Sequence, residues 1–513
     1  MKKLIIALVG CMILSAGCSE DVLNLNNPSA YNEDSYFKTQ KECQEAVIAC
    51  YSNLYQQGFY ARDWHFIFDL LTGEAVPTAQ LEGTLGLFDI FSYTQETSYF
   101  RFQWLGLYRM SMRALIAIEK VTAWQTINDS EEEMKKRLLG EAHFFHGWSY
   151  YLLTELWGDV PYHESWQSIR NEPAKPRTPY AEIQPHIEEA LKTAITMLPE
   201  YWNAANLGRL TKDAARAMLG KVYLTQGKNA EAIQQFQAVT ASQYHDDYYK
   251  LFVRGNHTSK EIIFQVLHKL FPGGNAYYMW GNPETTQARN CGRHMEYGWN
   301  DWNNVSIRNE ATDKFRYTLN DAPYIDPRNQ SIIYGDGVMG ADNFKGGKFP
   351  YLPFEPGNSP RGYKWKKYCL YEDYVNVAID DGDYSSILIR VADVKLMKAE
   401  AHIGLGDYGA ALALINEVRT RDAVQAEAYA DLNAGNAMEI LKRERFIELF
   451  GESHLWFDLL RWDRLGKTNM LDDLKNMKGI TVLEKYKKFP IPTGEKDTNP
   501  HMRVPGAIKD DWN

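Results

Sequence analysis

The stretch KDAARAMLGKVYLTQGKNAEAIQQFQAV, residues 212–239, decides the fold of this chain. Its apolar residues recur with a helical period in two successive runs, which predicts a pair of helices. The small residues Gly220 and Ala232 would let the two helices approach closely, and Tyr223 and Phe236 would fill the gap between them. These offsets match the tetratricopeptide spacing, so the stretch predicts a helical hairpin of that type.

Two further hairpins are predicted elsewhere in the chain. A degenerate copy of the pattern keeps the same offsets at Met397, Ala399, Ala411, Ile415 and Val418. A third hairpin is predicted from two long helical patterns at 104–121 and 131–156. Because an open solenoid normally needs at least about three units plus caps, we expect the hairpins to form a scaffold against which the rest of the chain packs.

The remaining chain separates into helical and irregular parts. Apolar patterns of helical period predict the other helices, which we place at 40–57, 180–198, 391–404, 408–421 and 437–450. In residues 245–385, glycine, proline, asparagine and aromatic residues dominate instead. A structureless loop of that length is implausible in a compact protein, so we expect short strands there, such as 261–267. The predicted fold class is mostly α, with tetratricopeptide-like helical hairpins and a large irregular, loop-rich insert segment.

The N-terminus has the pattern of a secretory leader. Lys2 and Lys3 precede an apolar run at 4–14 and small residues at 15–17. The run is too short to remain as a membrane-spanning helix, which takes ~20 apolar residues. The sequence Ser-Ala-Gly-Cys resembles a bacterial lipobox, whose cleavage would leave Cys18 as a lipid-modified N-terminus. An ordinary secretory signal with an incidental cysteine is the alternative.

These patterns divide the chain into five parts. They are a lipoprotein signal peptide at 1–17, a polar tether at 18–35, an N-terminal helical part at 36–244, the irregular segment at 245–385, and C-terminal helices with a tail at 386–513. Side chains that bind a ligand are expected in the irregular segment, because loops carried on a rigid scaffold are free to vary.

Composition restricts the class of function. The chain has 513 residues, of which 45% are apolar and 24% are charged, as is usual for a folded protein with a sizeable core. Its net charge of −10 would repel nucleic acid, and no basic patch is longer than 364–367, so no nucleic-acid partner is expected. Aromatic residues make up 13%, so either the core is packed with rings or an exposed surface is built for stacking.

Cysteine and histidine spacing gives no metal or redox motif. The cysteines outside the leader are Cys43, Cys50, Cys291 and Cys369, and none belongs to a Cys-x-x-Cys pair. His143 and His146 share a predicted helix, but no acidic residue on the same face completes a metal site. We therefore expect unpaired structural cysteines, core or surface histidines, and no metal or cofactor.

Several ordered motifs together resemble the SusD/RagB family, surface lipoproteins of Bacteroidetes that capture nutrients, mostly glycans. The motifs lie at 140–145, 156–161, 208–212, 390–394, 399–401, 443–445, 456–462 and 489–492. Most of these predict structural elements. Asp458, Arg461 and Trp462, for example, predict a buried polar anchor for the last helix.

The resemblance implies a non-enzymatic binder of oligosaccharides, lipid-anchored in the outer membrane and facing the cell exterior. By this resemblance, the protein looks like the lid of a SusC-like TonB-dependent barrel transporter. The transporter would receive the ligand when the lid closes. Three alternatives stay open from the residues alone. They are the same lid with a peptide or another nutrient, a secreted glycoside hydrolase, and a repeat scaffold that binds no small ligand.

The densest aromatic group of the irregular segment, at 277–303, is the candidate ligand site, and we call it the aromatic island. The predicted ligand contacts are Trp280, Arg293, Tyr297, Trp299, Asp301 and Trp302. A sugar ring can lie flat on an indole or phenol, while polar side chains bind its hydroxyls. Alternatively, the rings form a small core of their own. A second aromatic group, Phe59, Tyr60, Trp64 and Phe66, could face the same site.

Overall fold

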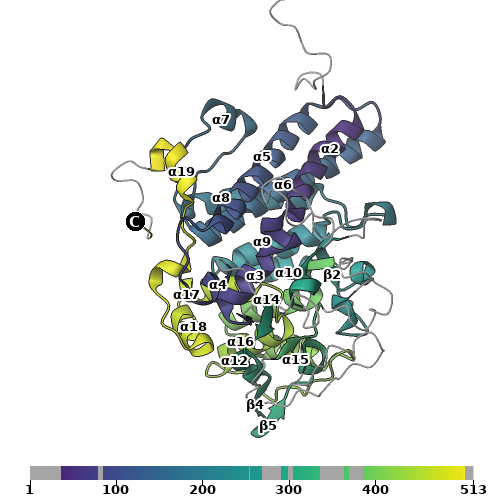
Figure 1. Ribbon diagram of the computed structural model, residues 1–513. Coiled ribbons are helices and arrows are strands. Elements are labelled where there is room, and N and C mark those ends of the chain that lie inside the picture. Colours follow the sequence, from purple (N-terminus) through teal and green to yellow (C-terminus); the bar gives the residue numbers. More distant parts are fainter. Residues whose placement is uncertain are drawn as a thin grey trace, which may run out of the picture.

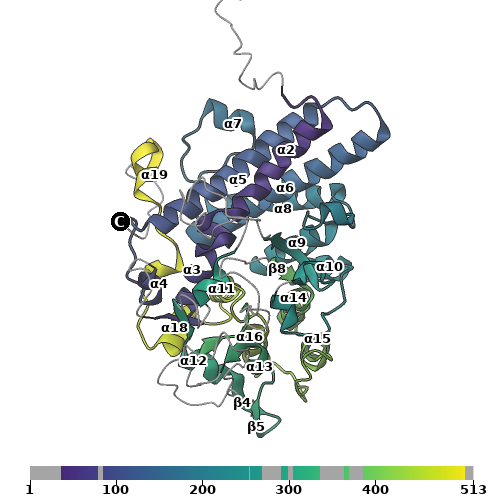
Figure 2. The ribbon, with the colours of Figure 1, turned by 45° about the vertical axis from the view of Figure 1, so that its right-hand side comes forward.

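The computed structural model describes residues 36–78, 85–253, 255–268, 291–297, 304–334, 363–368, 385–502 and 512 (Figure 1). Four long helices lie side by side in the upper half of the molecule in both views (Figures 1 and 2). They are α2 (Gln40–Tyr51), α5 (Ser98–Ala123), α6 (Asp129–Trp157) and α8 (Tyr180–Met197). Because α6 packs against both α5 and α8, the hairpin predicted from 104–121 and 131–156 is confirmed.

The stretch at 212–239 forms the predicted hairpin of α9 (Lys212–Thr225) and α10 (Asn229–Ala238). The side chain of Thr211 caps α9 by accepting a hydrogen bond from the backbone N–H of Ala214. A Cβ atom on Gly220 would collide with the ring of Phe236, so the close approach of the two helices depends on this glycine.

The second predicted hairpin is also present. It consists of α14 (Val391–Gly404) and α15 (Tyr408–Thr420), and α14 packs against α10 of the first hairpin. The C-terminal part continues with α16 (Ala437–Glu448), α17 (Leu455–Arg464), α18 (Met470–Lys478) and α19 (Thr493–Thr498). In the described part of the chain, no helix combines the length and the hydropathy that a membrane span requires.

The predicted buried anchor of the last helices is confirmed. Arg445 and Arg461 both donate hydrogen bonds to the carboxylate of Asp458, and all three side chains are buried. The indole N–H of Trp462 donates to Glu400 on α14 at 2.9 Å. The C-terminal helices are therefore joined to the second hairpin through buried polar contacts.

The described strands form four two-stranded antiparallel sheets. The pairs are β1 (Ala75–Pro77) with β3 (Val305–Ile307), β2 (Ile262–Leu267) with β8 (Ser385–Arg390), β4 (Arg316–Leu319) with β5 (Ala322–Ile325), and β6 (Ile333–Tyr334) with β7 (Lys364–Trp365). The strand expected at 261–267 is thus present as β2. Since β8 pairs with β2, the irregular segment leaves the scaffold and returns to it at one place, as an insert.

Short helices complete the described α-helices, and the helical patterns of the sequence predicted none of them. They are α3 (Asp63–Thr72), α4 (Gly86–Asp89), α7 (Trp166–Asn171), α11 (Arg293–Tyr297), α12 (Asn309–Thr312) and α13 (Asn329–Ile332). No helix was placed at 58–100 in the sequence, but α3 and α4 lie within it. All ten residues of α3 are buried, including the polar Asp63, His65, Asp69 and Thr72, so the polar residues of its sequence do not mark a surface face. A short, mainly apolar run such as this cannot be assigned to a helix or a strand by periodicity alone.

The first predicted helix, at 40–57, is shorter than expected. α2 ends at Tyr51, and a 3₁₀ turn at 52–55 and a short π-helix at 57–61 follow it. Phe59 has non-helical backbone angles, which interrupts the helical course of the chain there. Three of the expected structural cysteines, Cys43, Cys50 and Cys291, are buried, and Cys43 and Cys50 form no disulfide bond within the described part of the chain, whereas Cys369 lies outside it.

Candidate ligand-binding site

The structure describes only part of the predicted site. Arg293 and Tyr297 belong to α11, whereas Trp280, Trp299, Asp301 and Trp302 lie outside the described residues, as does the lipidation candidate Cys18. The two described positions show how the aromatic island is joined to the scaffold.

Arg293 and Tyr297 are core residues rather than exposed ligand contacts. Their exposed fractions are 2% and 1%. Arg293 Nη2 donates a hydrogen bond to Asp69 Oδ2 at 2.8 Å, and the Tyr297 hydroxyl donates to the same oxygen at 2.7 Å. The predicted ligand contact is therefore corrected for both residues, since their polar groups are directed at α3 inside the protein. We assign both residues the role of positioning the island.

Buried carboxyl groups give this anchor an unusual charge state. Burial raises the pKa of Asp69, although Arg293 lowers it in part. Burial and the neighbouring Asp69 raise the pKa of Glu74 to about 8. Glu74 accepts hydrogen bonds from the Gly451 backbone N–H and from the Thr72 hydroxyl, both at 2.8 Å. At neutral pH, Glu74 is therefore protonated in the folded protein.

The second aromatic group does not face a ligand site. Phe59, Tyr60, Trp64 and Phe66 are all at most 7% exposed, so this expectation is corrected. The rings of Phe59 and Trp64 stack with their centroids 5.7 Å apart. Next to them, the backbone N–H of Gly292 donates to the carbonyl of Ala61 at 3.0 Å. This group is thus part of the core beneath α11, and it supports the island from within the protein.

A buried ionic cluster holds the described parts of the insert against α16. Arg328 of the insert pairs with Glu444 and Glu448 of that helix, each at 3.0 Å. Lys367 of the insert pairs with Glu452 at 2.6 Å, and Arg390 at the end of β8 pairs with Glu448 and Glu452. Since every one of these side chains is buried, the insert is attached to the scaffold by charges that water does not screen.

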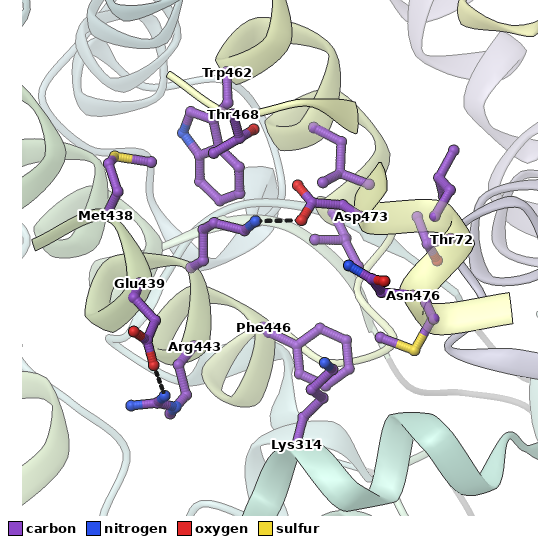
Figure 3. A pocket seen from close by; sticks show the side chains of 15 residues that line it. Thr72, Lys314, Met438, Glu439, Arg443, Phe446, Trp462, Thr468, Asp473 and Asn476 are labelled. Carbon is purple, nitrogen blue, oxygen red and sulfur yellow. Dashed lines mark hydrogen bonds and ion pairs between the residues drawn. The ribbon is translucent and has the colours of Figure 1, made fainter. Parts of the chain in front are cut away.

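Cavities open at several places in the described part of the chain, and we first consider the one among the C-terminal helices. This cavity of about 430 Å³ lies between α16, α17 and α18, with Trp462 and Thr468 on one side and Phe446 and Lys314 on the other (Figure 3). A salt bridge from Lys442 to Asp473 joins α16 to α18. Trp462 lines the cavity but is 0% exposed, so it offers no open ring face on which a sugar could stack.

The second cavity, of about 530 Å³, lies between α5, α6, α7 and α8, and we call it the α5–α8 cavity. It is lined by the half-buried rings of Tyr162 and Trp166 and by imidazoles and carboxylates, among them the exposed His186 and Glu189. Sequence analysis missed these residues as a group. Of the whole lining it considered only His143 and His146, which it weighed as a metal pair.

The fold defines the class of protein: a scaffold of tetratricopeptide-like hairpins with one large insert whose ends are paired by β2 and β8. Residues 260–504 match a family model described as the SusD family, and residues 28–224 match one described as "Starch-binding associating with outer membrane". The chain therefore belongs to the SusD family, and the second match supports an association with the outer membrane.

Named relatives and solved structures agree with this membership. SusD-like protein P2 of Formosa agariphila is 26% identical, over 90% of this chain and 91% of the relative. A SusD-like protein of Bacteroides ovatus is 24% identical, over 93% of this chain and 85% of the relative. A SusD superfamily protein from Bacteroides vulgatus has the same fold, with a TM-score of 0.71, 21% identity and coverage of 91% and 98% of the two chains.

Two of the similar structures carry a glycan in their names. A "Laminarin binding SusD-like protein" has a TM-score of 0.69 and 23% identity over 89% of this chain and 97% of its own. A structure described as "with xylogluco-oligosaccharide" has a TM-score of 0.70 and 19% identity over 90% of this chain and 98% of its own. At this level of identity, both comparisons establish the fold.

Proposed function

We propose that this protein captures an oligosaccharide outside the cell and delivers it, chemically unchanged, to a SusC-like TonB-dependent transporter in the outer membrane. The observation that carries the proposal is the match of residues 28–224 and 260–504 to SusD-family models, one of them described as starch-binding. The laminarin and xylogluco-oligosaccharide named for two proteins of the same fold support a glycan as the ligand class.

The ligand contacts in this proposal are Trp280, Trp299, Asp301 and Trp302. Indole rings supply flat apolar faces for the C–H face of a sugar, and the Asp301 carboxylate accepts hydrogen bonds from hydroxyls. Trp299 follows Tyr297 by two residues in the sequence, and the Tyr297 hydroxyl donates a hydrogen bond to Asp69. A fixed anchor reduces the conformational entropy lost when neighbouring side chains bind a ligand.

The cell-surface location rests on the leader. Lys2 and Lys3, the apolar run and the small residues before Cys18 fit export and lipidation at that cysteine. Lipidation by several acyl chains would anchor the protein firmly, because each buried CH₂ group contributes ~0.8 kcal/mol. The anchor would keep the binder close to its transporter, which raises the local concentration of captured ligand at the pore.

Binding of a glycan panel by the mature protein tests the proposal. Titration calorimetry with laminarin, xyloglucan and starch oligosaccharides should give saturable binding to at least one glycan. Trp299→Ala and Trp302→Ala should abolish this binding, whereas the control variant Tyr201→Ala changes a ring that is 81% exposed in the loop after α8 and should bind normally.

Each other outcome contradicts the proposal in a recognisable way. Shortened glycans after incubation would indicate a glycoside hydrolase, and binding of peptides alone would indicate a peptide lid. Binding that survives both tryptophan substitutions would place the glycan site outside the island.

A further inference from the structure

The α5–α8 cavity has the size and position of a binding site that is separate from the insert. Its volume of about 530 Å³ lies within the range of roughly 300–1,000 Å³ that is usual for small-molecule sites. Its lining comes from α5, α6, α8 and the segment at 162–166, which ends in the first residue of α7. Since no lining residue belongs to the insert, a ligand here would not compete with one bound at the aromatic island.

Flat rings form one part of the lining. Tyr162 and Trp166 are half-buried, and His186 is exposed on α8. The rings of Tyr162 and His186 stack with centroids 4.6 Å apart and an interplanar angle of 22°, which holds the phenol in place. A partly exposed, fixed ring can receive the apolar face of a sugar, and its π-face also attracts a cation.

The histidines add hydrogen-bond acceptors. His146 is 6% exposed, its Nδ1 atom lies 3.1 Å from the Ser111 hydroxyl, and it makes no other hydrogen bond with the residues that the structure describes. Burial lowers the pKa of His146 to about 3, with further contributions from His143 and His186, and burial also lowers the pKa of His143. Both imidazoles are therefore neutral near pH 7, and each keeps a ring nitrogen that accepts a hydrogen bond.

The charged groups of the lining are all carboxylates. Glu119 is paired with Lys120 at 3.1 Å, and Glu164 with Lys175 at 3.4 Å. Glu189 lies on α8, is exposed, and forms no salt bridge with any residue that the structure describes. No lysine or arginine belongs to the described lining of this cavity, so Glu189 is free to pair with a cation from outside.

A metal ion does not fit this arrangement. Although three histidines and three glutamates line the cavity, no three such groups in the described chain converge closely enough to hold one ion. The acceptors are instead spread over a volume that suits an organic ligand with several donors.

We propose that the α5–α8 cavity binds a sugar that carries a protonated amine. The ring of the sugar packs on Tyr162 and Trp166, the ammonium group pairs with Glu189, and its hydroxyls donate to the free imidazole nitrogens. The charge on the amine, and not the ring alone, gives the site its selectivity.

Three tetrasaccharides that differ only in the group at C2 of each sugar ring test this proposal. The probes are β-1,4-linked tetramers of glucosamine, of N-acetylglucosamine and of glucose, titrated into the mature protein at about pH 6, where the amine is protonated. The glucosamine tetramer should bind saturably and at least about tenfold more tightly than the other two, the usual effect of one charge-assisted hydrogen bond.

Matched variants assign the binding to the cavity. Glu189→Gln keeps the shape of the side chain, removes its charge, and should weaken binding of the glucosamine tetramer about tenfold. Trp166→Ala should also weaken it, whereas Glu182→Gln, an exposed change in the first turn of the same helix, should have no effect.

Equal binding of the three tetramers would overturn the role of the amine, and no binding of the glucosamine tetramer, or full binding by Glu189→Gln, would overturn the site. The island variant Trp299→Ala should retain this binding. Trp299→Ala tests the island proposed to bind the glycan, and Glu189→Gln tests the α5–α8 cavity. Each proposal can therefore fail while the other holds.

Discussion

Removing the charge of Glu448 should destabilise the protein strongly, because this carboxylate is the centre of the buried ionic cluster. Glu448 is 0% exposed and accepts hydrogen bonds from three arginines. These are Arg390 at 2.6 Å, Arg421 at 2.6 and 3.2 Å, and Arg328 at 3.0 Å. Burial alone would raise its pKa, but the three guanidinium groups hold the pKa well below its usual range. The folded protein therefore contains the ionised carboxylate.

The substitution Glu448→Gln places an amide among three buried cations and removes their common counter-charge. Removal of one partner from a buried ion pair typically costs about 3–5 kcal/mol, since the remaining charge is left without compensation. We expect a loss of that size in the free energy of unfolding, measured by urea denaturation with tryptophan fluorescence. Glu439→Gln on the same helix is the matched control, because the Glu439 side chain is 73% exposed in its pair with Arg443.

The control should change the free energy of unfolding by at most about 0.5 kcal/mol, as is usual for an exposed pair within one helix. If the loss in Glu448→Gln were below about 1 kcal/mol, the cluster would not be attaching the insert to α16. The same carboxylate also predicts acid sensitivity. Because its folded pKa is lowered, its stabilising effect is complete above the unfolded value of 4.5 and is lost as the pH falls through the folded pKa.

Two further predictions concern the anchor beneath the island and the first hairpin. At pH values between the ordinary pKa of 4.5 and the folded pKa of about 8, Glu74 holds a proton in the folded protein but has released it in the unfolded chain. The free energy of unfolding should therefore fall as the pH rises through this range, by at most ~1.4 kcal/mol per pH unit. Urea denaturation at several pH values should show a flatter profile in Glu74→Gln, and an unchanged slope would contradict the raised pKa. Gly220→Ala should lower the free energy of unfolding by about 1–3 kcal/mol, because the new Cβ atom meets the ring of Phe236. The control Gly409→Ala on α15 meets nothing within 4 Å and should leave the stability unchanged or raise it. Equal shifts of the melting temperature in the two variants would refute the close packing at Gly220.

The helical scaffold could be predicted from the sequence because its signals are local. α14 begins and ends at the predicted residues Val391 and Gly404, and the hairpin of α9 and α10 follows from offsets within 28 residues. α3 could not be predicted in this way. Every one of its residues is buried, including four polar ones, so its polar residues do not face water as they would on a surface helix.

The candidate site could be predicted only as a region, since its internal partners are far apart in the sequence. The composition of 277–303 marks an aromatic segment, but residue type does not determine whether a ring faces a ligand or the core. Arg293 and Tyr297 were assigned to the ligand, and both turn inward to Asp69, more than 220 residues earlier in the chain. The α5–α8 cavity likewise combines residues of several helices that no local motif connects.

Buried ion pairs fix the register of the insert against the scaffold. Arg293, Arg328 and Lys367 each place a buried charge of the insert against a carboxylate of the scaffold or its C-terminal helices. Apolar contacts would tolerate a slip of the chain, but a slip of one residue here would leave buried charges without partners, at a cost of several kcal/mol for each. The buried pairs therefore hold the described parts of the insert in one register against the scaffold and its C-terminal helices.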